Sequence, residues 1–514
     1  MKKKLMFLGV RLFAVLAFGM IFVLLGTLMA QAAVFTVNDT VADGDPGSLR
    51  DAIKQANAAV GQDTILLQPG RYMLTMGQLE IQQDLSIQGR RANRTFIDGN
   101  KNGRVFFITT ALNPNTKVKM EGITITGGEV QESNDGTGGG IYNEGDLTIN
   151  RCTITKNTVQ ADSAYGGGIS NLGNLTINNS SITKNSTSGW IQFGGGIYNA
   201  GNLISRNSSI SKNAIFGGFT GHGGGICSLG NNVKTTLIHS KVNGNTITAN
   251  DSFGGGIFSG GFTTTFTLIR SQVTGNTTGT LSIEGAVGGG IYSEGYLIIK
   301  RSKVTGNSVE GAIGAYGGGI QCFDNATIER SQITGNSVKG TWEVFGGGIT
   351  SSGNLTLSYS KVTGNTANGE LTFAYGGGID CYGNTTIKHS QITGNTVNAY
   401  RYEAAGSGIY SHGDLTILSS KITGNMAIIT GNMADADESW ARGGGIYSYV
   451  YENQATFRLI GSKVTRNTAS CSTPEENSGI CTEEGGGIWI GNRMSYTERK
   501  TIVKRNSPDQ VFFE

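Results

Sequence analysis

The chain has 514 residues, with 81 glycines and only 5 prolines, a composition that excludes collagen and proline-rich linkers because both need far more proline. Its formal net charge is +3, but four of its 40 Lys and Arg lie in the first 33 residues. The remaining chain therefore has 36 Lys and Arg against 37 Asp and Glu, a net charge of −1. This overall charge gives no reason to expect nucleic acid as a partner.

Residues 1–33 have the layout of a secretory signal peptide. Three lysines at positions 2–4 precede an apolar run that ends in the small residues Ala30-Gln31-Ala32. If it is left uncut, the run from residue 12 to 33 is long enough to span a bilayer of about 30 Å, so a membrane anchor is the alternative. No second apolar span follows. We expect a secreted or cell-surface protein whose only membrane contact would be an uncleaved N-terminal segment.

Residues 34–126 have an irregular sequence that predicts an N-terminal cap and irregular coils. A strand is followed by a turn at residues 43–47 and by an amphipathic helix that begins near Ser48, with Asp51 completing a capping box. The apolar stripe of this helix consists of Leu49, Ala52, Ile53 and Ala56. We expect the helix to cover the open end of the first coil, whose strand edges would otherwise be unpaired.

Residues 127–506 contain twelve copies of one unit. Each unit begins with GGG, or in one copy GSG, and contains a later [IV]-x-x-N; the first reads GGGIYNEGDLTINRCTITKN from Gly138 to Asn157. In eight of the twelve units the asparagine lies 19 residues after the first glycine, and most of the variation in length falls between the asparagine and the next GGG. A repeat near 29 residues with this pattern is typical of a solenoid with insertions on one side.

The repeat predicts a parallel β-helix with three strands per coil, from the segments GGGIYN, DLTIN and CTITKN. Alternation places Ile141, Leu147, Ile149 and Ile154 on one face, which stacked coils would bury. A leucine-rich repeat is the rival fold, but it needs an apolar segment or a helix where this unit has GGG. No proline interrupts a repeat core. We therefore predict an all-β, single-stranded parallel β-helix of about twelve coils, followed by a C-terminal tail at residues 507–514.

Stacking would place equivalent residues in rows with a spacing of about 4.8 Å. The twelve [IV]-x-x-N asparagines are expected to form one row whose side-chain amides hydrogen-bond along the axis. The position two residues before the core Ile or Val holds Cys152, ten serines and Thr501. Only small side chains occur there, which predicts an inward corner.

Two segments resemble exported β-helix proteins. The stretch FTVNDTVADGDPGSLRDAIKQAN…GQDTILLQPGRYML resembles the N-terminal segment of proteins named for a CSLREA motif, although this chain has GSLRDA without that cysteine. The GGGI…[IV]xxN units resemble the GGA[ILV]…FxxN repeats of chlamydial polymorphic outer-membrane proteins and of adhesin-like β-helix proteins. This resemblance implies a right-handed parallel β-helix with a surface or secreted role, commonly adhesion.

The glycine and carboxylate motifs do not predict a phosphate site or an active site. No GGG is followed by Lys-Ser/Thr, and each leads into a strand instead of a helix. The acids on the GGGI strand, Glu144, Glu294 and Asp380, are not in adjacent or next-but-one coils of one row, as an acid/base pair would require. The four histidines lack metal-ligand spacing, and we interpret them as surface residues. We expect no catalytic residue, metal or cofactor.

Candidate binding residues fall in two predicted outward rows. The residue after the GGGI isoleucine is aromatic in seven units: Tyr142, Tyr198, Phe258, Tyr292, Tyr410, Tyr447 and Trp489. These rings either cover bare glycine backbone or form a ladder for sugar rings or a partner. The residue before the core Ile or Val alternates between Lys and Gln from residue 241 to 421, with arginines nearby. This row is either a solvated edge that discourages aggregation or a binding site for an acidic glycan. The candidate binding residues are Lys303 and Lys361 in the row and the nearby Arg301 and Arg330.

The six cysteines fit an exported protein. Cys471 and Cys481 bracket one loop, and we predict a disulfide between them. Cys322 and Cys381 share a row two coils apart, beyond the roughly 7 Å between Cα atoms that a disulfide allows, so both should be free.

Together these features predict a secreted or cell-surface, non-catalytic, monomeric β-helix that presents an extended face for adhesion or polysaccharide binding. A polysaccharide lyase or glycoside hydrolase is the alternative, and a purely structural envelope protein is the second alternative.

Overall fold

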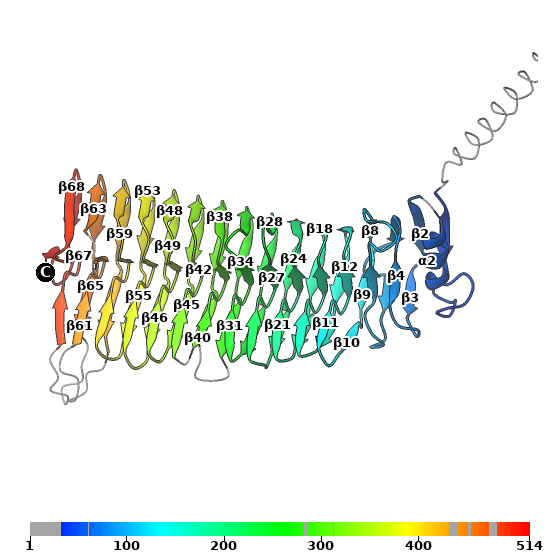
Figure 1. Ribbon diagram of the computed structural model, residues 1–514. Helices are drawn as coiled ribbons and strands as arrows, with labels where there is room; N and C mark the ends of the chain where they lie inside the picture. The colour runs from blue at the N-terminus through cyan, green and yellow to red at the C-terminus, as the bar shows by residue number, and fades with distance from the viewer. Residues whose placement is uncertain are drawn as a thin grey trace, which may run out of the picture.

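The computed structural model describes residues 32–59, 61–280, 285–311, 313–430, 439–450, 454–471 and 481–513. The chain winds into a rod of stacked coils whose strands pair in parallel (Figure 1). This confirms the predicted all-β parallel β-helix. The predicted signal peptide falls almost entirely outside the described residues, and within them no helix is long and apolar enough to cross a membrane.

The first eleven repeat coils contain five short strands each, so the prediction of three strands per coil is wrong. In the first repeat coil the three predicted strands are present as β12 (Ile141–Asn143), β13 (Asp146–Asn150) and β14 (Thr153–Thr155). Two more follow in the segment that we expected to hold only insertions, β15 (Thr158–Gln160) and β16 (Ser163–Tyr165). Strand pairing from coil to coil produces five parallel sheets, named A to E below.

Sheet C contains β12 and has 15 strands, from β4 (Leu79–Ile81) to β70 (Val511–Phe513). Sheet A contains β13 and has 16 strands, from β1 (Val34–Val37) to β68 (Met494–Arg499). Sheet B contains β14 and has 15 strands, from β3 (Gly70–Met73) to β69 (Ile502–Lys504). Sheets D and E contain β15 and β16 and have 12 strands each. The chain passes through them in the order C, A, B, D, E.

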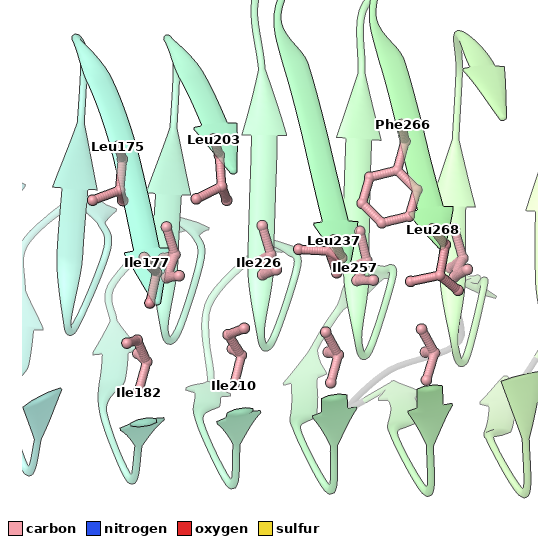
Figure 2. Close-up of a cluster of buried hydrophobic side chains, with 14 of the residues drawn as sticks. Leu175, Ile177, Ile182, Leu203, Ile210, Ile226, Leu237, Ile257, Phe266 and Leu268 are labelled. Carbon is pink, nitrogen blue, oxygen red and sulfur yellow. The ribbon is translucent and has the colours of Figure 1, made fainter. Parts of the chain in front are cut away.

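The main core lies between sheets C, A and B. Figure 2 shows Leu175 and Ile177 on a sheet A strand, Ile182 on a sheet B strand and Ile226 on a sheet C strand, with their side chains in the interior. Each is at most 1% exposed. Full burial of one such side chain contributes about 1.5–3 kcal/mol, and the same set recurs in coil after coil.

Sheets D and E enclose a second, narrower core. Its buried residues are small, and in the C-terminal half they are Ala286, Val309, Ala315, Val338, Val344, Ala367, Ala374, Val397, Ala399, Ala404, Ala427, Ile429, Ala441 and Ala469. Each strand here has only two to four residues. An alternation that short cannot be told from a loop in the sequence, which is why we missed these two strands.

The predicted asparagine row is confirmed as a continuous ladder between the two cores. All twelve asparagines are buried, and each Nδ2 donates to the Oδ1 of the asparagine in the next coil, at 2.9–3.1 Å from Asn157 to Asn506. The same Nδ2 also donates to a backbone carbonyl one coil back, as Asn336 does to Val304 at 3.0 Å. Gln510 ends the ladder, because its Oε1 accepts from Asn506 at 3.2 Å. Each amide therefore ties three coils together.

The GGG motif lies beside this ladder, in the part of the coil between the two cores, which we call the neck. The first glycine has a positive φ, as at Gly317 (+63°), which favours glycine. A Cβ on the third, Gly319, would lie 2.5 Å from the Gly348 carbonyl oxygen and 2.9 Å from Asn336 Nδ2. The glycines are required because strands from two sides of the coil approach the ladder too closely for a side chain. The middle position is less strict, since Ser407 occupies it in one coil.

The N-terminal helix has the predicted position and cap. It is α2 (Leu49–Ala58), its stripe residues Leu49, Ala52, Ile53 and Ala56 are buried, and Ser48 Oγ accepts from the Asp51 N–H at 3.2 Å. It packs against β4, β1 and β2 (Asp63–Leu67) at the N-terminal end of the rod (Figure 1). The small-residue row is also as predicted: the backbone N–H of each corner residue from Cys152 to Ser420 donates to the hydroxyl one coil on, as Ser302 does to Ser331 at 3.0 Å.

We predict that Asn336→Ala lowers the free energy of unfolding by about 3 kcal/mol. The substitution leaves the buried Asn307 N–H without a partner, and such a group costs about 1–3 kcal/mol. It also removes the bonds that the Asn336 side chain makes to Asn307, to the Val304 carbonyl and to Asn365. The measurement is urea unfolding followed by intrinsic fluorescence. Gln332→Ala, on an exposed side chain of the same coil, is the control and should change stability by less than about 0.5 kcal/mol. Equal losses in the two variants would contradict the role of the ladder.

We also predict that Gly319→Ala destabilises the rod far more than Gly335→Ala. Gly335 has a positive φ of +61° but open space around its Cβ position, so alanine there costs only the roughly 1–2 kcal/mol of a left-handed residue. At Gly319 the new methyl meets backbone at 2.5 Å. The same unfolding assay compares the two, and a Gly319→Ala midpoint at or above that of Gly335→Ala would refute close packing at the neck.

Candidate functional site

The predicted aromatic row on sheet C forms a packed cluster with a second aromatic row on sheet E. The second row consists of the aromatic residues immediately before GGG, such as Tyr165, Phe193 and Phe253. Tyr165 stacks on Phe193 at 5.0 Å between ring centroids, and its edge meets Tyr198 at 5.0 Å. Further along, Phe253 and Tyr292 meet at 5.4 Å in the same edge-on geometry. The two rows therefore pack against each other over the glycines.

Of the seven candidate rings, five are buried: Phe258, Tyr292, Tyr410, Tyr447 and Trp489, at 1–8% exposure. Only Tyr142 and Tyr198 are half-buried. Tyr447 stacks on Trp489 at 4.2 Å and on Tyr410 at 4.9 Å, so neighbouring rings cover its faces. The structure has the first of the two predicted arrangements, rings that cover glycine backbone. Sugar binding by these rings stays a prediction, and burial leaves little ring surface for it.

Three polar residues interrupt the aromatic row in consecutive coils. Gln321, Thr350 and Asp380 are direct partners in sheet C, and Asp380 is followed by Tyr410. Asp380 is 0% exposed, and neither carboxylate oxygen has a hydrogen-bond partner among the described residues. Burial raises the pKa of this carboxyl well above its usual range. A side chain so fully enclosed cannot reach a polymer on the surface.

The other two candidate acids, Glu144 and Glu294, each directly follow a sheet C strand and accept hydrogen bonds from nearby loops. Glu144 Oε2 accepts from Thr109 Oγ1 at 2.9 Å, and Glu294 Oε2 accepts from the Gly261 N–H at 2.6 Å. The three acids are not brought together. Within the described residues no group of His, Cys, Asp and Glu has the geometry of a metal site.

A charged cluster that the sequence pattern did not reveal lies near the C-terminal end of sheet E. Arg442 Nε donates to Glu484 Oε2 at 2.8 Å, and Arg442 Nη1 lies 3.5 Å from Glu403 Oε1. Tyr375 donates its hydroxyl proton to Glu403 at 3.0 Å. Burial raises the pKa of Glu403, although Arg442 opposes this. The acids come from β56 (Glu403–Ala405) and β66 (Cys481–Glu484), on either side of β61 (Ser439–Arg442), which strand pairing alone brings together.

Two of the four histidines are half-buried in stacks of rings, which corrects our interpretation of all four as surface residues. His222 is stacked between Phe193 at 4.9 Å and Phe253 at 5.2 Å, and His412 stacks on Tyr382 at 4.4 Å. Burial lowers the pKa of each to about 4. The neutral imidazole replaces an aromatic ring in a stack. His239 and His389 are exposed, as predicted.

The predicted Lys/Gln row is aligned on the outer face of sheet B. Lys303 lies between Gln272 and Gln332 in the register, and Lys361 between Gln332 and Gln391. In every sheet B strand from β14 to β64 (Lys463–Thr465) the central residue is buried and the two flanking ones point outward. The third residue forms a second outward row, Thr in nine of these eleven strands, with Ser211 and Asn243 in the other two.

Arg301 and Arg330 lie in a third row at the corner between sheets A and B. Both are exposed and have a positive φ near +50°. Arg330 pairs with Glu329 at 3.3 Å and lies 5.7 Å above the Tyr359 ring. This corner row, which has Arg in four of the twelve coils, at Arg151, Arg270, Arg301 and Arg330, therefore shares one face with the Lys/Gln row and the Thr row. This face is the strongest candidate binding surface on the molecule.

Cys322 and Cys381 are free and buried, with Ser351 between them in the register, as predicted. Cys152 and Cys227 are also free. Cys471 is in a disulfide. The side chain of Cys481 lies outside the described residues, so the predicted pairing stays a prediction.

Comparison with known proteins identifies no family for this chain. No protein-family model and no curated protein matches the chain. Among solved structures, ORF18 of Geobacillus virus E2 has a TM-score of 0.34 at 13% identity over 63% of this chain and 62% of its own. The A-module of the Azotobacter vinelandii mannuronan C-5 epimerase AlgE6 has a TM-score of 0.32 at 12% identity over 90% and 99%. Pectate lyase Pel9A has a TM-score of 0.32 at 15% identity over 58% and 76%.

We predict that Asp380 makes the rod less stable as the pH rises from about 4. Its folded pKa is raised above the unfolded value near 3.9, so the folded state holds the proton more tightly and loses stability with increasing pH, by at most about 1.4 kcal/mol per unit. Asp380→Asn removes this titration. The variant should match the wild type near pH 4 and exceed it in urea midpoint at pH 7. A constant difference between the two across this range would show that Asp380 does not titrate this way.

Proposed function

We propose that this protein is an exported, non-catalytic rod that binds an extended glycan along its surface. The observation that carries the proposal is the outer face of sheet B, where a Lys/Gln row runs in register through eight coils, from Lys241 to Lys463, beside a row that is mostly Thr. At about 4.8 Å per coil, twelve coils present a face of roughly 58 Å. An extended polymer can contact the same side chains repeatedly along such a face.

The chemistry of these rows suits a glycan. Thr hydroxyls and Gln amides donate and accept hydrogen bonds, as sugar hydroxyls do. Lys303 and Lys361 lie on the outer face with exposed side chains. The strands that hold them are paired on both sides, so little backbone conformational entropy is lost when a ligand binds.

The sequence resemblance supports an envelope role. The GSLRDA segment and the GGGI…[IV]xxN units are similar to those of CSLREA-type proteins and of polymorphic outer-membrane and adhesin-like proteins. With the N-terminal signal segment, this favours a secreted or cell-surface monomer that contacts a polysaccharide or another cell surface. Nucleic acid is not an expected partner.

A glycan-degrading enzyme is the second candidate, and the Glu403–Arg442–Glu484 cluster is the observation that favours it. Two carboxylates beside a guanidinium are the groups that such catalysis uses. Both acids, however, are ion-paired with Arg442 at 2.8 and 3.5 Å. We therefore assign this cluster a structural role between coils.

The test is retention and turnover on one panel of immobilised neutral and acidic glycans. The mature chain should be retained on at least one extended glycan and should release no reducing ends or unsaturated products. Product release that Glu403→Gln abolishes would establish the enzyme instead. If no glycan is retained at any ionic strength, the proposal fails and a purely structural envelope role is favoured.

A further inference from the structure

The charges of the repeats are sorted by face. We consider the seven-residue segment that begins in the row of Arg301 and Arg330, passes through a sheet B strand and ends at the ladder asparagine, such as residues 301–307. The twelve copies of this segment contain sixteen Lys and Arg and no Asp or Glu. The rest of the chain after residue 33 has the other 20 Lys and Arg against all 37 acids. A nearly neutral protein thus combines one face of +16 with a remainder of −17.

These cations are largely unneutralised by the protein itself. Among the described residues only two of the sixteen form an ion pair, Arg151 with Glu121 and Arg330 with Glu329. The candidates Arg301, Lys303 and Lys361 have none there and are exposed. Like charges one or two coils apart, at about 4.8–9.6 Å, repel each other within a Debye length of roughly 8–10 Å. Such a face holds mobile anions, and their release favours the binding of a polyanion.

We propose that sheet B binds a linear anionic polysaccharide laid parallel to the rod axis; this rests on the proposed function and names its ligand class. The corner arginines and the Lys/Gln row contact carboxylate or sulfate groups. The Thr row, two residues along each strand from the Lys/Gln row, hydrogen-bonds sugar hydroxyls. Thr305 and Thr334 share a hydrogen bond at 3.1 Å, as do Thr363 and Thr393 at 3.2 Å. Because a hydroxyl has one donor and two acceptor lone pairs, one such bond leaves each pair able to bond to a ligand.

The geometry favours a polysaccharide over nucleic acid. The outward residues of strands β14 to β69 include no aromatic side chain, and the corner row beside them has one exposed tyrosine, Tyr359, which stacks on His389. Single-stranded nucleic acid is usually held by stacking successive bases on a series of aromatic rings, which this face does not have. The face repeats about every 4.8 Å, whereas phosphates repeat about every 3.4 Å along each strand of a DNA duplex. The rows of Thr hydroxyls match the many hydroxyls of a sugar chain.

The test uses polygalacturonate, a linear chain with one carboxylate per sugar, and its fully methyl-esterified form, which has the same backbone without charge. The full mature chain should bind polygalacturonate at least tenfold more tightly than the ester, and its affinity should fall with added salt. Affinity should increase with oligomer length up to about 58 Å and then level off, because a longer chain overhangs the twelve coils.

Matched variants locate the site. Lys303→Gln with Lys361→Gln introduces the residue that neighbouring coils already have in this row, so the fold is kept. This pair should weaken polygalacturonate binding at least fivefold and reduce its salt dependence. The control pair, Lys117→Gln with Lys234→Gln, removes two exposed charges from the far edge of sheet A and should change affinity less than twofold.

The outcomes separate this inference from the proposed function. Equal binding of the charged and esterified polymers, or equal loss in the two variant pairs, would overturn the anionic ligand and its site while leaving glycan binding intact. No retention of any glycan would overturn both. Binding of duplex DNA as tight as that of polygalacturonate at equal salt would show a general polyanion surface and would contradict the polysaccharide assignment.

Discussion

The asparagine ladder is the interaction on which the whole rod depends. Each coil is too small to bury an apolar core by itself, so every coil must be fixed in register on the next. The twelve amides do this at the neck between the two cores, where each one bonds to the coil before and the coil after. The amide suits this position because its donor Nδ2 and its acceptor Oδ1 are separate atoms that bond to neighbouring coils at the same time, as in Asn336.

The ladder in turn determines where glycine must occur and what surrounds it. The third glycine of each GGG has no room for a Cβ beside the asparagine amide, and the bare backbone on its other side is covered by the two aromatic rows. The aromatic residues that are prominent in the sequence therefore serve mainly as packing and are weaker candidates for ligand binding. With the rings used as packing, the outward side chains of sheet B are the ones available to a ligand, and their net charge is positive.

The repeat in the sequence was sufficient to predict the β-helix, its inward Ile and Leu residues and the ladder. These predictions succeed because twelve copies average out local ambiguity, and because Asn157 and its equivalents occur at a fixed offset. The strands of sheets D and E were not predictable, since segments such as Ser163–Tyr165 are too short for alternation to register. The choice between the two interpretations of the aromatic row needed the structure for a related reason: alternation shows that Tyr447 points away from the main core, but not that neighbouring rings cover it. The Glu403–Arg442–Glu484 cluster joins residues about 40 positions apart that only the strand register brings together.

The most direct test of the account is a lysine footprint. The chain is labelled with an amine-reactive reagent with and without polygalacturonate, and modification is read for each lysine by mass spectrometry. We expect protection of the sheet B lysines Lys241, Lys303, Lys361, Lys421 and Lys463, with Lys117 and Lys234 on sheet A unchanged. Protection spread evenly over both sheets, or confined to sheet A, would contradict a binding face on sheet B.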